Sequence, residues 1–225
     1  MRYYPVNLDI RNRPCLVVGG GRVGARKVAT LIQCGAVVTV VSPRVTTAVK
    51  QLAEDEAIVL EQRPYRSSDG EGMFLVIGAT DDETLNRQIN ADAEGRHQLC
   101  NIADRPEICN FILPAIVRRG DFVMAVSTAG KSPAFAKHIR KCLEAQFGPE
   151  YGELLDLMGA IRSRLLAEAH EPEAHKPLFE QLISENLLDL VKDKKTDSID
   201  RLLEKVLGPG YRYDSLMPSE PQPGE

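Results

Sequence analysis

Three glycines near the N-terminus have the spacing of a phosphate-binding turn. Gly19, Gly21 and Gly24 match the pattern G-x-G-x-x-G and follow the apolar run 15–18. In such a turn the first glycine allows a tight bend, the second lets the backbone approach a pyrophosphate, and the third lets a helix pack close to the strand. A helix that begins here presents unpaired N–H groups to an anion. The pattern predicts a dinucleotide site; the alternative is a turn that is rich in glycine for packing alone.

The residues around this turn indicate a β-strand before it and an amphipathic helix after it. Val28, Leu31 and Ile32 follow at helical spacing, and Gly35 is placed to end the helix. The apolar segment 37–41 then has the composition of a second buried strand. Together these segments predict a βαβ unit, which is the context in which the glycine pattern binds a dinucleotide.

The end of the second expected strand leaves the choice between NAD and NADP open. An NAD site usually has Asp or Glu there to bind the ribose hydroxyls, but this chain has Ser42, Pro43 and Arg44. The Ser42 side chain or the backbone groups of Pro43 and Arg44 would have to replace the carboxylate. Arg44 could instead favour the 2′-phosphate of NADP.

Another expected strand ends at the same crevice. The unbroken apolar run 73–78 is typical of a central strand, and it leads into Gly78, Ala79 and Thr80. Because ligands bind at the carboxyl ends of the strands in a doubly wound sheet, we expect these three residues to contact the cofactor. Thr80 and Asp81 are equally consistent with ordinary helix caps.

Asp104 follows the next expected strand, 99–102. A carboxylate at this edge can accept a proton or contact a metal ion. Its position beside Arg105 and Pro106 is also typical of a turn residue, and position alone favours the turn. Cys109 lies in an apolar segment, which is more typical of a core residue than of a nucleophile.

The pattern changes after residue 110. The apolar segments 111–117 and 122–127 predict a β-hairpin around a turn at 118–121. The hairpin is apolar on both faces, and a single hairpin of this kind needs a partner sheet. A second copy of the chain is the simplest source of that sheet, so the sequence predicts a homodimer.

A second anion-binding region is expected after the hairpin. Ser132 is placed to cap a helix that begins at Pro133. Cations gather around this helix in an otherwise acidic chain, namely Arg118, Arg119, Lys131, Lys137, His138, Arg140 and Lys141. This concentration is consistent either with a pocket for a polycarboxylate or with a solvated helix face.

The composition limits the classes of function. The 225 residues are 43% hydrophobic with a net charge of −4, which suits a folded protein and argues against nucleic acid as a partner. Five cysteines without a CxxC pair do not indicate a disulfide framework, and the spacing of His170 and His175 does not indicate a preformed metal site. Because no apolar run reaches the length of a membrane span, we expect a soluble, cytoplasmic protein without a membrane partner.

Five motifs in a fixed order resemble the precorrin-2 dehydrogenase and sirohydrochlorin ferrochelatase family. This family includes the N-terminal half of siroheme synthase and the yeast-type bifunctional enzyme. The motifs are Cys15–Lys27, Ala79–Asp82, Asn101–Asp104, Phe111–Ala115 and Val126–Pro133. The resemblance spans residues 1 to about 165, and the helical remainder resembles the family only in class.

The resemblance implies an α/β fold in three parts. A Rossmann-type parallel sheet is followed by a small α+β dimerisation domain and a helical C-terminal domain. The expected boundaries are 1–112 for the NAD-binding domain, 113–147 for the hairpin and helix of the dimerisation domain, 148–207 for the helical domain and 208–225 for a flexible tail. Helices are expected in the helical domain at about 150–169, 176–192 and 198–206.

The family activity that the resemblance implies is NAD-dependent oxidation of precorrin-2 to sirohydrochlorin in siroheme biosynthesis. Some members also insert ferrous iron. By position, Arg22, Val23, Pro43 and Arg44 correspond to the family's NAD contacts together with the glycine turn, and Asp104 corresponds to its catalytic aspartate. This correspondence replaces the interpretation of Asp104 as a simple turn residue.

The substrate implied by the resemblance is a tetrapyrrole with many carboxylates. The residues expected to bind it are Ser127, Thr128, Gly130, Lys131 and Ser132. An alternative is an NAD-binding regulatory module without catalytic activity. That alternative shares the Rossmann half but gives no reason for the segment 127–133 or its basic helix.

Overall fold

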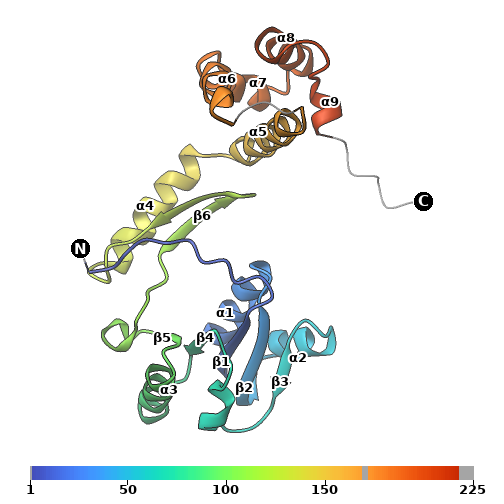
Figure 1. Ribbon diagram of the computed structural model, residues 1–225. Helices are drawn as coiled ribbons and strands as arrows, with labels where there is room; N and C mark the ends of the chain where they lie inside the picture. Colours follow the sequence, from blue (N-terminus) through green and yellow to red (C-terminus); the bar gives the residue numbers. More distant parts are fainter. Residues whose placement is uncertain (1, 169–171, 218–225) are drawn as a thin grey trace. The chain divides into compact units, whose positions relative to one another are not determined.

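The structure is a computed structural model, which describes residues 2–168 and 172–217 (Figure 1). It divides into two compact units. The first consists of Met1–Leu113 with Ala129–Lys131, and the second of Pro114–Thr128 with Ser132–Glu225. Within the described ranges, no helix is both long and apolar enough to cross a membrane.

A five-stranded parallel sheet forms the centre of the first unit, in the order β3-β2-β1-β4-β5. Its strands are β1 (Pro14–Gly20), β2 (Val37–Val45), β3 (Val59–Glu61), β4 (Leu75–Gly78) and β5 (Leu99–Ile102). Strand β1 pairs with β2 on one side and β4 on the other, so the direction of winding reverses beside β1. Ligands bind at such a reversal in doubly wound sheets. The predicted Rossmann-type sheet is confirmed.

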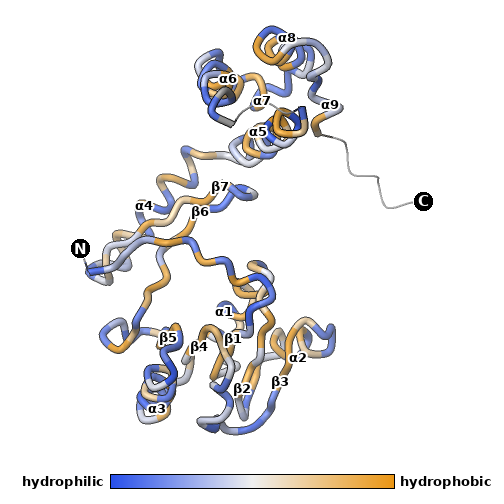
Figure 2. The backbone as a smooth tube through the Cα atoms, viewed as in Figure 1, coloured by the Kyte–Doolittle hydropathy of each residue, from blue (hydrophilic) through white to orange (hydrophobic). Residues whose placement is uncertain are grey.

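Helices cover both faces of this sheet because successive strand residues point to opposite sides. On one side, Val17 belongs to a core with α1 (Arg22–Gln33) and α2 (Thr47–Glu54). On the other side, Val18 belongs to a core with α3 (Glu83–Gly95). The strands are hydrophobic along most of their length in Figure 2, as expected for a sheet buried on both faces.

The second unit begins with the predicted hairpin, which is shorter than expected. It consists of β6 (Ala115–Arg119) and β7 (Phe122–Val126), and α4 (Pro133–Gln146) follows it. Residues 111–114 precede the hairpin instead of forming its first strand. Gly120 has a φ of 58°, which permits a tight turn. Arg118 and Arg119, which were expected in the turn, therefore belong to β6 and pair with residues of β7.

The hairpin is fastened to the helices of its own unit. The Arg119 guanidinium donates hydrogen bonds to the backbone oxygens of Phe147 (2.9 Å) and Glu144 (3.0 Å). The Phe122 ring stacks on Tyr151 with a centroid separation of 5.6 Å. A Cβ at Gly152 would lie 2.8 Å from the Arg119 carbonyl oxygen. This glycine therefore lets its own helix, α5 (Glu150–Ala167), approach β6 closely.

The remaining helices pack around one apolar core. They are α5 (Glu150–Ala167), α6 (Pro172–Ser184), α7 (Leu187–Lys192), α8 (Thr196–Leu207) and α9 (Tyr213–Leu216). Ile161, Leu182 and Leu203 are fully buried in this core. The single helix expected at 176–192 is wrong, because Asn186 has a φ of 62° and separates α6 from α7.

The expected flexible tail differs from the structure in its first part. Tyr211 is only 3% exposed and belongs to the helical core. Its hydroxyl donates to Glu168 at 2.7 Å, and the Arg164 guanidinium lies 4.3 Å from the centre of its ring. Residues 208–217 therefore form part of the folded second unit, while 218–225 lie outside the described residues.

Ile161→Ala should destabilise the second unit by about 2–5 kcal/mol, because it leaves a cavity in a fully buried position. The measurement is urea unfolding followed by helical circular dichroism. Ile183→Ala is the matched control, since Ile183 is 60% exposed and its truncation should change stability by less than about 0.5 kcal/mol. Equal losses in the two variants would contradict the assigned core.

Candidate functional site

The glycine turn joins β1 to α1 and requires glycine at two of its positions. Gly19 has a φ of 110°, and a Cβ there would lie 2.3 Å from the carbonyl oxygen of Ala79. Gly24 is buried in α1, and a Cβ there would lie 1.9 Å from the carbonyl oxygen of Gly19. Helix α1 therefore packs against the end of β1 at a distance that only glycine allows.

Gly21 differs from the other two glycines because it faces open space. A Cβ at Gly21 would have nothing within 4 Å, and the residue precedes α1 as its N-cap. No side chain among residues 2–168 and 172–217 caps this helix start. The backbone N–H groups of Arg22 and Val23 lie in the first turn, where an anion is favoured by the helix dipole. The geometry fits a pyrophosphate group.

The glycine between Gly19 and Gly21 has a role that the sequence pattern did not reveal. A Cβ at Gly20 would lie 2.4 Å from a methyl carbon of Val45, where the pairing of β1 with β2 shifts register. The end of β2 is thereby brought beside the glycine turn. The signal was present as a third consecutive glycine, but G-x-G-x-x-G does not use that position.

The end of β2 presents Pro43 and Arg44 as exposed residues at this edge. The Ser42 side chain is buried, and its hydroxyl donates to the Arg44 backbone oxygen at 2.7 Å. The Ser42 hydroxyl, which was a candidate for binding the ribose, is therefore used in a hydrogen bond within the end of β2. Pro43 and Arg44 remain the residues available for that contact.

The end of β4 lies directly against the glycine turn. Ala79 donates its N–H to the Val18 carbonyl oxygen at 2.8 Å, and a Cβ at Gly19 would also approach the Thr80 methyl group at 3.3 Å. A Cβ at Gly78 would lie 2.6 Å from the terminal carbon of Ile102, so β4 and β5 pack closely at this glycine. Gly78, Ala79 and Thr80 are thus brought to the crevice edge.

The helix cap in this segment is neither Thr80 nor Asp81. The Asp82 carboxylate caps α3 by accepting a hydrogen bond from the Leu85 N–H at 3.0 Å. Thr80 instead pairs with Asn86: their side-chain oxygens lie 2.8 Å apart, and the Asn86 amide donates to the Thr80 backbone oxygen at 2.9 Å. Asn86 is a buried residue that sequence reasoning missed, because polar residues in a helix give no signal of burial.

Asp104 follows β5 in a fixed turn at the same end of the sheet. Its φ is 61°, and its side chain is exposed. Ala103 donates its N–H to the Gly78 carbonyl oxygen at 2.8 Å, which ties the turn to β4. The carboxylate therefore stands at the carboxyl edge formed by β1, β4 and β5.

The Cys109 thiol holds this turn together. Its sulfur accepts a hydrogen bond from the Ile102 N–H at 3.1 Å and donates to the Arg105 backbone oxygen at 3.0 Å. Burial raises the pKa of Cys109, so the group stays a thiol near neutral pH. These contacts favour a structural role, as the sequence indicated.

The residues expected to bind substrate fall into both units. Gly130 and Lys131 belong to the first unit, where a Cβ at Gly130 would lie 3.9 Å from the Pro106 ring. Ser127, Thr128 and Ser132 belong to the second unit. Ser132 caps α4 as predicted, since its hydroxyl accepts from the Phe135 N–H at 3.2 Å.

The basic concentration is partly used by contacts within the second unit. The Arg119 guanidinium donates to three backbone oxygens, those of Phe147, Glu144 and Arg118. Arg140 forms an ion pair with Glu144, and the Arg118 guanidinium donates to the Gly120 oxygen at 3.0 Å. In the part of the chain that the structure describes, no three His, Cys, Asp or Glu side chains are grouped so that they could hold a metal ion. His170 lies outside the described residues.

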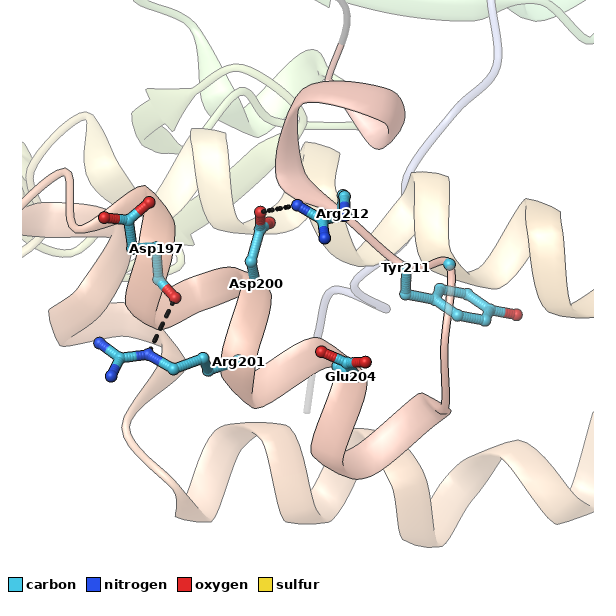
Figure 3. A pocket seen from close by; sticks show the side chains of 7 residues that line it. Asp197, Asp200, Arg201, Glu204, Tyr211 and Arg212 are labelled. Carbon is cyan, nitrogen blue, oxygen red and sulfur yellow. Dashed lines mark hydrogen bonds and ion pairs between the residues drawn. The ribbon is translucent and has the colours of Figure 1, made fainter.

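A small pocket in the helical part has a structural explanation. It has a volume of about 250 Å³ and is lined by charged residues of α8 and the segment after it (Figure 3). Arg212 lies 3.7 Å from the Asp200 carboxylate, which also accepts a hydrogen bond from the Tyr213 N–H at 2.7 Å. These contacts fasten the end of the described chain to α8, so we do not assign the pocket to the reaction.

Two family models match separate stretches of this chain. Residues 6–115 match a family model described as NAD(P)-binding, and residues 119–146 match the model of the sirohaem biosynthesis protein central domain. The siroheme synthase of Methylococcus capsulatus is 35% identical over 215 residues, which are 95% of this chain and 45% of that protein. The siroheme synthase of Mannheimia succiniciproducens is 32% identical over 225 residues, which are 100% of this chain and 47% of that protein.

A solved structure matches over nearly its full length. The structure of SirC, a precorrin-2 dehydrogenase, superimposes with a TM-score of 0.74 at 25% identity, covering 91% of this chain and 99% of that chain. The chain thus spans less than half of the siroheme synthases described above but almost all of SirC. It belongs to the siroheme-biosynthesis family that includes precorrin-2 dehydrogenase and siroheme synthase.

Proposed function

We propose that this chain oxidises precorrin-2 to sirohydrochlorin with NAD as the hydride acceptor, a step in siroheme biosynthesis. The observation that carries the proposal is the edge where β1, β4 and β5 end. An uncapped helix start above Gly21 and the exposed Asp104 carboxylate lie at that one edge, in a chain that matches almost all of a precorrin-2 dehydrogenase. The same match over a whole enzyme favours catalysis over a purely regulatory NAD-binding module.

The cofactor is held by backbone and not by a ribose carboxylate. We assign the pyrophosphate to Gly19, Gly21, Gly24 and the N–H groups of Arg22 and Val23, because an anion is stabilised at a helix N-terminus. Pro43 and Arg44 would contact the ribose. Gly78, Ala79 and Thr80 would contact the cofactor from the end of β4. When bound, NAD accepts a hydride from the substrate.

Asp104 is the residue we assign to proton transfer. Loss of a hydride from the reduced tetrapyrrole must be accompanied by loss of a proton, so that precorrin-2 and NAD⁺ give sirohydrochlorin, NADH and H⁺. An exposed carboxylate at the crevice edge can accept that proton. The left-handed turn and its bonds to β4 and Cys109 keep the carboxylate in position.

The substrate side of the site is assigned to the turn between the hairpin and α4. Lys131 supplies a cation, and Ser127, Thr128, Gly130 and Ser132 supply hydroxyl and backbone groups for the carboxylates of the tetrapyrrole. The proximity of Gly130 to Pro106, two residues after Asp104, supports this assignment within the first unit.

A homodimer is also proposed, on the basis of the hairpin. Ile116 is 43% exposed and Val123 is 48% exposed, and both lie on the hairpin face opposite to the buried Val117, where Ile116 pairs with Ala125 and Val123 pairs with Arg118. Exposed apolar side chains on one sheet face favour burial against another surface. A second copy of the chain supplies a matching face.

Substitution of Gly24 and of Gly21 should have different effects on stability, although both should weaken cofactor binding. Gly24→Ala should cost about 1–3 kcal/mol of stability and abolish NAD binding, because the new methyl group meets the Gly19 carbonyl. Gly21→Ala should cost no more than about 1 kcal/mol but weaken NAD binding at least about tenfold, because its methyl group occupies the phosphate position. Thermal unfolding and NAD calorimetry measure these effects. Wild-type NAD affinity in Gly21→Ala would place the pyrophosphate elsewhere.

Asp104→Asn should keep NAD binding and lose at least about a hundredfold in turnover, because the amide cannot accept the proton. The assay mixes the enzyme with precorrin-2 and NAD under anaerobic conditions and follows NADH and sirohydrochlorin by absorbance. Asp81→Asn is the control, since this exposed residue neither caps α3 nor is assigned to the reaction. Full activity in Asp104→Asn would remove the catalytic assignment, and no turnover in active wild-type protein would refute the proposed reaction.

Val123→Asp should convert the dimer to a monomer, because it places a charge on the proposed interface. Sedimentation velocity measures the mass of the particle, and circular dichroism checks that the variant is folded. Ile183→Asp is the control, because Ile183 is 60% exposed on α6, outside the hairpin. A wild-type monomer, or an unchanged dimer in Val123→Asp, would contradict the interface.

A further inference from the structure

The end of β2 is the place where a dinucleotide site of this kind discriminates between NAD and NADP, because the adenosine ribose lies there. In this chain the strand ends in Ser42, Pro43 and Arg44, none of which carries a carboxylate. The Ser42 hydroxyl is used within the strand, where it donates to the Arg44 backbone oxygen at 2.7 Å. The strand end therefore lacks the acidic group that binds the ribose hydroxyls in an NAD-specific site and repels a 2′-phosphate.

The carboxylate on the neighbouring strand is paired. Strand β3 runs parallel to β2, and its last residue, Glu61, lies opposite Val41. The Glu61 carboxylate lies 3.3 Å from the Arg63 guanidinium. The first turn of α1 and the first turn of α2 contain no acidic residue. A negatively charged ligand at the end of β2 thus meets no unpaired carboxylate from the two strand ends or the two helix starts.

Arg44 is held beside the glycine turn by its backbone. Gly20 pairs with Val45 across β1 and β2, and the Thr46 N–H donates to the Gly20 carbonyl oxygen at 2.9 Å. A Cβ at Gly20 would lie 3.1 Å from the Arg44 carbonyl oxygen. The residue is therefore next to the turn that we assign to the pyrophosphate, at the distance along the cofactor where the ribose follows.

The Arg44 side chain is available to a ligand. Arg44 is exposed, and its guanidinium forms no hydrogen bond or ion pair with any of the residues that the structure describes. Arg63, by contrast, binds the Asp69 carboxylate at 2.7 Å. No internal ion pair has to be broken before the Arg44 guanidinium binds an anion.

The start of α2 also suits an anion near Arg44. Thr46 precedes this helix, and its side chain does not cap it. The N–H groups of the first turn and the helix dipole favour negative charge at such a start. Because the Thr46 N–H is bonded to Gly20, the start of α2 is fixed to the glycine turn. The helix alone would not define a site, but it adds to the effect of the unpaired arginine.

We propose that this chain accepts NADP as well as NAD, and that Arg44 binds the 2′-phosphate of NADP. The phosphate carries a charge of about −1.5 to −2 near neutral pH, and a guanidinium can donate two parallel N–H bonds to it. With NADP the reaction is precorrin-2 and NADP⁺ giving sirohydrochlorin, NADPH and H⁺. The inference rests on the proposed function, because it uses the same glycine turn and the same hydride transfer.

Calorimetry of the full chain with NADP and with NAD tests binding without turnover. The wild-type protein should bind both dinucleotides. Arg44→Met should lower the NADP affinity relative to the NAD affinity at least about tenfold, because only NADP loses a charge-assisted bond to phosphate. Arg13→Met is the matched control, since Arg13 is an exposed arginine just before β1, at the opposite end of the strand, and its loss should leave this ratio unchanged.

The outcomes separate this inference from the proposed function. If the wild type binds NAD but not NADP, this inference alone is wrong. An unchanged affinity ratio in Arg44→Met, or an equal change in Arg13→Met, would also overturn it. If neither dinucleotide binds, the proposed function fails, and this inference fails with it.

The anaerobic assay with precorrin-2 and NADP tests the reaction itself. The wild type should form NADPH and sirohydrochlorin, and Arg44→Met should lower kcat/KM for NADP relative to NAD at least about tenfold. Arg44→Asp should lower this ratio further, because its carboxylate repels the 2′-phosphate. Turnover with NAD and none with NADP would contradict the inference and leave the proposed function intact.

Discussion

The close approach of α1 to the end of β1 is the constraint on which the rest of the site depends. Gly24 rests on the Gly19 carbonyl, and Gly19 in turn leaves room for Ala79 at the end of β4. A methyl group added at Gly24 would meet the Gly19 carbonyl oxygen, and one added at Gly19 would meet the Ala79 carbonyl oxygen at the end of β4. That packing places the positive end of α1 and the end of β4 at one edge of the sheet. The anion-binding N-terminus of α1 therefore reaches the end of the sheet that carries Asp104 because Gly19 and Gly24 have no side chains.

The second level of organisation is the loop after β5. The Ala103 N–H donates to the Gly78 carbonyl oxygen, and the Cys109 sulfur accepts a hydrogen bond from the Ile102 N–H. These contacts hold Asp104 in a left-handed conformation, which is uncommon for a non-glycine residue. A buried thiol thus has a use that is neither nucleophilic nor redox. In the second unit, Gly152 and Arg119 have a comparable structural role, because they fix the hairpin on the helices and leave its other face, with Ile116 and Val123, exposed.

Much of the first unit could be predicted because its signals are local. Glycine at positions 19 and 24 indicates a tight turn and a close helix–strand contact at those positions, and the apolar runs indicate strands buried on both faces. Contacts between side chains and backbone gave no such signal: the pairing of Asn86 with Thr80 does not follow from their spacing in the sequence. The break at Asn186 was missed because the helical pattern continues through it, and the packing of Tyr211 because its proline- and glycine-rich surroundings resemble a tail.

The central claim is that one edge of the sheet holds the nicotinamide cofactor and places Asp104 against the tetrapyrrole. A crystal structure of the chain with NAD and sirohydrochlorin bound tests it most directly. The account predicts the pyrophosphate on the N-terminus of α1 beside Gly21, with an Asp104 carboxylate oxygen within hydrogen-bond distance of the macrocycle. A cofactor bound away from the glycine turn, or an Asp104 side chain directed away from the macrocycle, would contradict it.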